Sequence, residues 1–142
     1  MKIYIAILFI FLTNCNHQKK YDERLLGVWK SNKKETVERF IKTHPAHVKK
    51  MGNEKFKKFK ALFGKLEITY TATECKAKLN DFETINKYSI VEQGDDYIIL
   101  KHEDENIKEN EFIKFVDGGY WLKPHKNSNF MEKFDRVEGG LD

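Results

Sequence analysis

The chain has 142 residues, of which 40% are hydrophobic and 34% are charged, and its formal net charge is +4. A chain of this length and composition forms one globular domain with one core, and it is too short for two domains. The small net charge argues against nucleic acid as a partner.

The first fifteen residues, MKIYIAILFIFLTNC, have the parts of a secretory signal. Lys2 precedes an apolar run from Ile3 to Leu12, and a short polar exit follows it. About ten apolar residues fall short of the ~20 that a transmembrane helix needs. A buried N-terminal helix of a cytosolic domain would show a polar face at helical spacing, and this segment shows none. The pattern therefore predicts an export signal.

The residues around Cys15 resemble a bacterial lipobox, in the sequence Leu12-Thr13-Asn14-Cys15. Leu12 and Thr13 match that pattern, whereas Asn14 stands where Gly, Ala or Ser is usual. The resemblance implies a diacylglyceryl group on Cys15 and cleavage before it, so that two or three acyl chains anchor the protein in a membrane of the bacterial cell envelope. Asn16 resembles the sorting pattern for an outer membrane, where the cell has one.

These features divide the chain into four parts. They are a lipoprotein signal peptide at 1–14, the lipidated cysteine and a tether at 15–23, a single domain at 24–138 and a tail at 139–142. We expect the domain to be a monomer held at the membrane by its N-terminal lipid.

The domain begins with a short strand at Leu25–Ser31, which a helical region follows. Asn32 and Glu35 have the spacing of a capping box, so they predict the start of a first helix. Pro45 ends that helix and opens a second one, which Gly52 could divide and Gly64 stops.

The second helix is amphipathic and basic, because His47–Lys65 holds seven lysines against Glu54. In one interpretation its aromatic residues pack on the core while its lysines are only solvated. In the other the lysines also face anionic lipid headgroups. The membrane-facing candidates are Lys49, Lys50, Lys57, Lys58 and Lys60.

From Lys65 onward, apolar and polar residues alternate, as they do in half-buried strands. The predicted strands are 65–72, 84–92, 97–102, 111–116, 120–123 and 129–137, so that the domain has seven in all. Tight turns without intervening helices favour an antiparallel meander, and a meander of this length curls to protect its edges. The predicted fold class is therefore mainly β (α+β), a closing barrel with a helical pair inserted between its first two strands.

Gly27 and Trp29 on the first strand, together with Arg136 on the last, resemble the lipocalin-like (calycin) barrels. The resemblance implies that Trp29 closes one end of the barrel and that Arg136 lies over its indole. Two features depart from that family: the long helical insertion and the count of seven strands. They predict a barrel that is partly open, with the helical pair over its mouth or flank.

Two functions are compatible with this domain, and neither is catalytic. The predicted function is a cavity that binds a small, partly apolar ligand; the alternative is a protein-binding module of the inhibitor or immunity type, with a solidly packed barrel. Candidate lining residues for the cavity are Tyr70, Tyr88, Ile90, Tyr97, Ile99, Phe112 and Tyr120.

The residues that could carry catalysis or bind a metal lack a recognisable pattern. Cys75 has no base near it in the sequence, so we interpret it as a small residue half-buried in a strand. The histidines fit no metal-binding spacing, and the acidic run Glu103–Glu111 does not match an EF-hand loop. We therefore predict no cofactor, no metal and no enzymatic activity.

Overall fold

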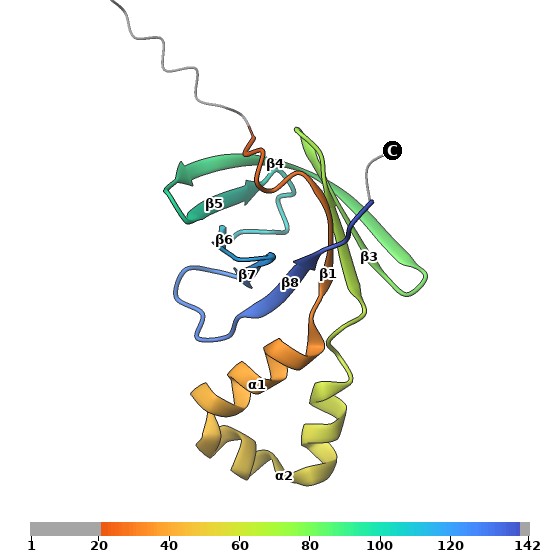
Figure 1. Ribbon diagram of the computed structural model, residues 1–142, viewed down its shortest axis with the longest axis vertical. Coiled ribbons are helices and arrows are strands. Elements are labelled where there is room, and N and C mark those ends of the chain that lie inside the picture. The colour runs from red at the N-terminus through yellow and green to blue at the C-terminus, as the bar shows by residue number, and fades with distance from the viewer. Residues whose placement is uncertain (1–20, 140–142) are drawn as a thin grey trace, which may run out of the picture.

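The computed structural model describes residues 21–139, which form a closed antiparallel β-barrel (Figure 1). Each strand pairs with the next along the chain, and the last pairs with the first. The strands are β1 (Gly27–Ser31), β2 (Leu66–Tyr70), β3 (Glu74–Leu79), β4 (Phe82–Gln93), β5 (Tyr97–His102), β6 (Glu111–Val116), β7 (Gly119–Lys123) and β8 (Glu132–Arg136). The mainly β fold class and the closing barrel are thus confirmed, whereas the signal peptide, Cys15 and the last three residues of the predicted tail lie outside the described residues.

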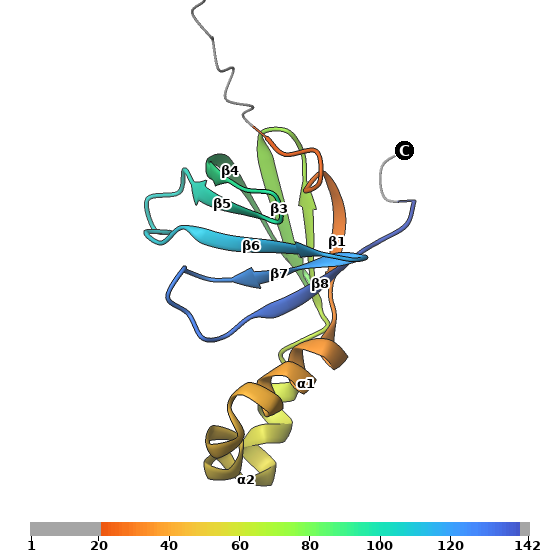
Figure 2. The same cartoon turned by 60° about the vertical axis from the view of Figure 1, so that its left-hand side comes forward.

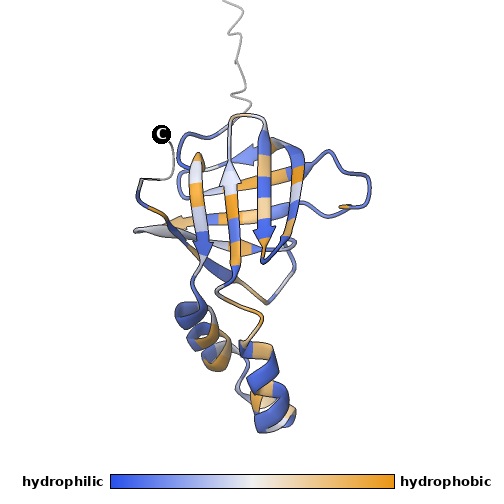
Figure 3. Cartoon of the chain, turned by 90° about the vertical axis from the view of Figure 1, so that its right-hand side faces the viewer, coloured by the Kyte–Doolittle hydropathy of each residue, from blue (hydrophilic) through white to orange (hydrophobic). Residues whose placement is uncertain are grey.

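The barrel closes with eight strands, so the prediction of seven strands and a partly open barrel was wrong. The missing strand is β3, which pairs with β2 from Leu79 to Cys75. Its sequence, ECKAKL, places only small side chains, Cys75 and Ala77, on the inner face, while lysines occupy the outer face. Glu, Lys and Ala are depleted in strands, so this segment has a low strand propensity although its residues alternate. Figure 3 shows apolar and polar residues alternating along strands of the barrel wall.

Two helices, α1 (Lys33–Thr43) and α2 (Pro45–Lys60), connect β1 to β2, as the sequence predicts. The Asn32 side chain caps α1 by accepting a hydrogen bond from the Glu35 amide at 3.0 Å. Gly52 interrupts α2 with a φ of 73°, outside the helical range, so the basic segment consists of two short helices. Among residues 21–139, no helix has the length and apolar content needed to cross a membrane.

The helical hairpin formed by α1 and α2 projects from one end of the barrel, and the first described residues lie at the other end (Figures 1 and 2). β1 runs from Gly27, beside the N-terminal segment, to Ser31, where the hairpin begins. The direction of β1 therefore places the N-terminal segment and the helical hairpin at opposite ends of the barrel.

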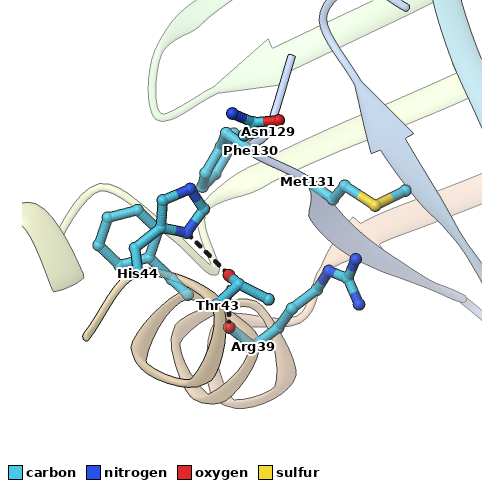
Figure 4. A pocket seen from close by; sticks show the side chains of 7 residues that line it. Arg39, Thr43, His44, Asn129, Phe130 and Met131 are labelled. Atoms are coloured by element: carbon cyan, nitrogen blue, oxygen red, sulfur yellow. Dashed lines mark hydrogen bonds between the residues drawn. The ribbon is translucent and has the colours of Figure 1, made fainter. Parts of the chain in front are cut away.

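The hairpin is held to the barrel by a cluster of phenylalanine rings. Phe40 of α1 contacts Phe59 of α2 with ring centroids 4.5 Å apart, and Phe63 stacks on Phe130 of the β7–β8 loop at 5.5 Å. Beside this cluster, Thr43 donates a hydrogen bond to the Arg39 carbonyl and lies 2.7 Å from His44 Nδ1 (Figure 4). The crevice seen in that view is too narrow to hold a water molecule. The aromatic face of the hairpin is therefore used for packing, which leaves its polar face to solvent.

Candidate functional site

One end of the barrel is closed by Trp29 and Arg136. The guanidinium carbon of Arg136 lies 4.5 Å from the centroid of the Trp29 ring, the arrangement that the lipocalin resemblance implies. The same guanidinium donates hydrogen bonds to the carbonyls of Arg24 and Leu26, each at 3.0 Å. Gly27 has a φ of +127°, and a Cβ there would lie 3.0 Å from Arg136 Nη1, so both its conformation and its small size are required.

The N-terminal segment is fastened over this closed end by a buried carboxylate. Asp22 accepts hydrogen bonds from Arg24 Nη2 and Gln93 Nε2, both at 2.7 Å. Arg24 also donates to the carbonyls of Gly94 and Asp95. Burial acts to raise the pKa of Asp22, but the hydrogen bonds from Arg24 and Gln93 outweigh it, and this pKa lies below its usual value. The segment that leads to the predicted anchor is thus fixed to the barrel from Asp22 onward.

The barrel interior is occupied by its own side chains. The Trp29 and Tyr120 rings have centroids 4.8 Å apart, Tyr120 and Phe134 are 5.2 Å apart, and Tyr70 meets Tyr88 edge-on at 5.7 Å. An eight-stranded barrel is just wide enough for side chains to fill it. Aromatic rings therefore take up much of the space that a ligand would need.

Four of the seven predicted lining residues face this interior. Tyr70, Tyr88 and Tyr120 belong to the core, and Ile90 packs against it. On β5 and β6 the core residues are instead Ile98, Leu100 and Ile113.

The other three predicted lining residues lie on the outside of the barrel, one residue out of register. The rings of Tyr97 and Phe112 stack there with centroids 5.5 Å apart, and Ile99 is paired with Phe112. A strand turns successive side chains to opposite faces, so Ile98 and Leu100 cannot share the inner face with Ile99. Tyr97, Ile99 and Phe112 are therefore corrected to outer-face residues.

A polar cluster interrupts the otherwise apolar interior. Cys75 Sγ lies 3.7 Å from His102 Nδ1, and His102 Nε2 lies 3.0 Å from Glu111 Oε2, an ion-pair distance without the alignment of a hydrogen bond. The hydrogen bond with Cys75 and the contact with Glu111 raise the pKa of His102 to about 10, against the effect of burial. His102 is therefore an imidazolium at neutral pH.

Two tyrosine hydroxyls complete the cluster. Burial raises the pKa of both Tyr70 and Tyr120 well above the usual value, so both side chains stay uncharged. The Tyr120 hydroxyl has no well-aligned hydrogen-bond partner among the described residues, and such a buried group indicates a bound water or a ligand. Tyr70 and Tyr120 are among the predicted lining residues, whereas the sequence indicates no role for His102 or Glu111.

The lysines of the helical hairpin point to solvent. No residue of α2 is fully buried, and of the five membrane-facing candidates, Lys49, Lys50, Lys57 and Lys58 are exposed. Lys60 is half-buried, with its ammonium 5.0 Å from the centroid of the Phe56 ring.

An open hollow of about 350 Å³ adjoins the C-terminal end of α2, and Lys30, Lys65 and Lys78 line it together with Glu67. We call the exposed lysines of α2 and of this hollow the basic surface. Its members are Lys30, Lys49, Lys50, Lys55, Lys57, Lys58, Lys65 and Lys78.

Two other histidines of the described residues pack on the aromatic cluster of the hairpin. His44 stacks on Phe40 at 4.8 Å, and His47 meets the same ring edge-on at 6.0 Å. In the acidic loop between β5 and β6, Asp104 accepts hydrogen bonds from Asn106. Within residues 21–139, no group of three or more His, Cys, Asp or Glu side chains is arranged to hold a metal ion.

Comparisons of the chain with protein-family models, curated proteins and solved structures found no match.

Proposed function

We propose that this protein is a lipid-anchored binding module of the bacterial cell envelope, and that its basic surface binds an acidic region of a partner protein. The observation that supports this most is the position of the basic surface. It lies on and beside the helical hairpin, at the end of the barrel opposite the N-terminal segment. In this proposal the barrel is a rigid support and its role is binding rather than catalysis.

The anchor proposal rests on the lipobox resemblance at Cys15. Six residues, 15–20, separate the predicted lipid from the described domain, and they can span about 20 Å when fully extended. β1 alone adds about 17 Å between the two ends of the barrel, and the hairpin extends beyond it. A tether of this length favours a hairpin that points away from the anchoring membrane, so we propose a protein rather than that membrane's headgroups as the partner.

The chemistry of the surface fits an acidic protein. Exposed lysines raise the rate of encounter with an oppositely charged surface and select against basic partners. Apolar residues that could form the centre of an interface lie on the same hairpin region: Leu62, which follows α2, is 67% exposed, and Ile41 of α1 is 42% exposed. In such an interface the two apolar side chains would form the buried centre, and the lysines would lie in the polar rim around it.

Reversing charge on this surface should abolish partner capture in the living cell. We would place a photo-reactive amino acid at Asn53, beside the lysines, and irradiate cells that make the full-length protein. Lys57→Glu with Lys58→Glu should reduce the cross-linked protein adduct at least about tenfold, because attraction becomes repulsion.

The matched control reverses Lys101 and Lys114, which are exposed on the barrel wall, and should leave the adduct unchanged. A photo-reactive residue at exposed Ser89 should give no adduct. Cross-links from Asn53 to lipid alone, or an adduct indifferent to Lys57 and Lys58, would contradict the proposal.

A small ligand inside the barrel is the second candidate, and a specific observation favours it. The Tyr120 hydroxyl is buried without a well-aligned partner among the described residues, close to the uncharged Tyr70 hydroxyl. A ligand with one hydrogen-bonding atom and a small apolar body would satisfy it. Because the surrounding rings are packed together, a larger ligand would have to displace Trp29 or Phe134.

A further inference from the structure

Within the polar cluster, Cys75 lies beside two side chains that flank the β5–β6 loop, His102 and Glu111. Cys75 comes from β3, His102 from the end of β5 and Glu111 from the start of β6. The residues Cys75 and His102 are 5% and 6% exposed, whereas the Glu111 side chain is 24% exposed. The cluster therefore begins inside the barrel and reaches solvent at Glu111, beside the β5–β6 loop.

This order of side chains is that of an activated thiol. A thiolate is the nucleophilic form of cysteine, and a neighbouring imidazolium stabilises it. His102 presents Nδ1 to the sulfur, while Glu111 lies at Nε2 and holds the ring in its charged form. A nucleophile, a base and a group that orients the base are the elements of nucleophilic sites in general.

The other titratable side chains around the Cys75 thiol are tyrosines, and they are uncharged at neutral pH. Tyr70 of β2, Tyr88 of β4 and Tyr120 of β7 surround it, and burial raises the pKa of each, that of Tyr88 to about 12. Tyr88 also donates a hydrogen bond to the Thr71 carbonyl at 2.6 Å. All three tyrosines are uncharged at neutral pH, so Glu111 is the carboxylate that pairs with His102.

We propose that Cys75 is a nucleophilic thiol that reacts with small neutral hydroperoxides, with His102 and Glu111 as its positioning and acid–base residues. Apolar and aromatic side chains pack around Cys75, so a small uncharged molecule reaches the thiol at a lower desolvation cost than an ion does. The unpartnered Tyr120 hydroxyl can donate a hydrogen bond to a peroxide oxygen.

The reaction is a two-electron oxidation of sulfur. The thiolate attacks the terminal oxygen of the hydroperoxide, an S–O bond forms and the O–O bond breaks. The departing alkoxide takes a proton from the His102 imidazolium and leaves as the alcohol, while Cys75 becomes a sulfenic acid. Cys75 is the free cysteine of the described residues, so within residues 21–139 there is no second thiol to form a disulfide and the sulfenic acid persists until an external thiol reduces it.

The test compares the reactivity of Cys75 in the native and urea-unfolded full-length protein at pH 6. Hydrogen peroxide is added, the sulfenic acid is trapped with dimedone, and the peptide that contains Cys75 is followed by mass spectrometry, which separates it from Cys15. We expect the native thiol to react at least about tenfold faster than the unfolded one, because His102 lies beside the sulfur only in the folded protein.

Two variants assign the effect to the cluster. His102→Asn should lower the native rate to that of the unfolded chain or below, and Glu111→Gln should lower it less while shifting its pH profile. Glu111 is partly exposed, so its substitution tests the cluster even where His102→Asn fails to fold. A native thiol that reacts more slowly than the unfolded one, or a rate unchanged in Glu111→Gln, would identify Cys75 as an inert core residue and overturn the proposal.

Discussion

Trp29→Ala should lower the free energy of unfolding by about 3–5 kcal/mol, the cost expected for removing a large buried aromatic side chain. Trp29 is 3% exposed, packs on Tyr120, and donates a hydrogen bond from Nε1 to the Leu25 carbonyl at 2.7 Å. Truncation leaves a cavity at the closed end and removes the support beneath Arg136. Equilibrium unfolding in urea measures the loss.

A loss of stability in Trp29→Ala could come from ordinary core packing or from the contact of Trp29 with Arg136. A double-mutant cycle distinguishes these two causes. Trp29→Ala and Arg136→Ala together should show a coupling energy of about 0.5–2 kcal/mol, the range of a cation–π contact. Arg39 serves as the matched control, because its guanidinium lies over Trp121 at 5.1 Å rather than over Trp29. The control pair, Trp29 and Arg39, should show no coupling energy. If Trp29 and Arg136 also show none, the cation–π contact does not contribute to closing the barrel.

Cys15→Ser should transfer the protein from the membrane fraction to the soluble fraction of the cell envelope. Anchoring by two or three acyl chains depends on about 0.8 kcal/mol for each buried methylene, and serine carries no thioether-linked lipid. Fractionation after labelling with a radioactive fatty acid measures both lipidation and location.

Cys75→Ser is the matched control for this substitution, since it removes the free cysteine of the described domain and should leave fractionation and labelling unchanged. A Cys15→Ser protein that stays in the membrane fraction, or one that still incorporates the label, would rule out the lipobox interpretation.

The sequence predicted those features that depend on local periodicity. The helical pair and most of the strands show clear alternation or helical spacing, and Asn32 caps the first helix as its spacing with Glu35 indicates. β3 was missed because Glu, Lys and Ala have a low strand propensity, although the apolar and charged residues of this segment alternate.

The inward register could not be read from β5 or β6. β5 has three consecutive apolar residues, Ile98 to Leu100, so both faces look buried in the sequence. In β6, Phe112 and Ile113 are adjacent and both apolar. Pairing between β5 and β6 decides which side chains face the barrel interior, and it places Ile98 opposite Ile113 in the core.

The polar cluster depends on the topology of the whole barrel. His102 and Glu111 flank one hairpin loop. Leu100 pairs with Glu111, and His102 lies two residues after Leu100, so the His102 and Glu111 side chains are on the same face of the sheet. That hairpin was predicted, so their proximity was accessible from the sequence. Cys75 joins them only because β3, the strand that was not predicted, pairs with β4 and lies near the end of β5.

The position of the lysines likewise required the three-dimensional fold. Helical spacing predicts that the phenylalanines of α2 pack and that its lysines are exposed, and the Phe40–Phe59 contact agrees with this. Whether the lysines face the anchoring membrane depends on the direction of β1, which carries the chain from the N-terminal end to the opposite end. This long-range relation is the basis for proposing a protein partner.

Native mass spectrometry of the full-length protein, extracted gently from its own membranes, tests the central proposal most directly. We predict a complex with a second protein that dissociates at high salt and is missing in the Lys57→Glu, Lys58→Glu variant. A protein that carries only a small extra mass, retained at high salt and lost on denaturation or in Tyr120→Phe, would contradict the proposal and assign the function to the barrel interior.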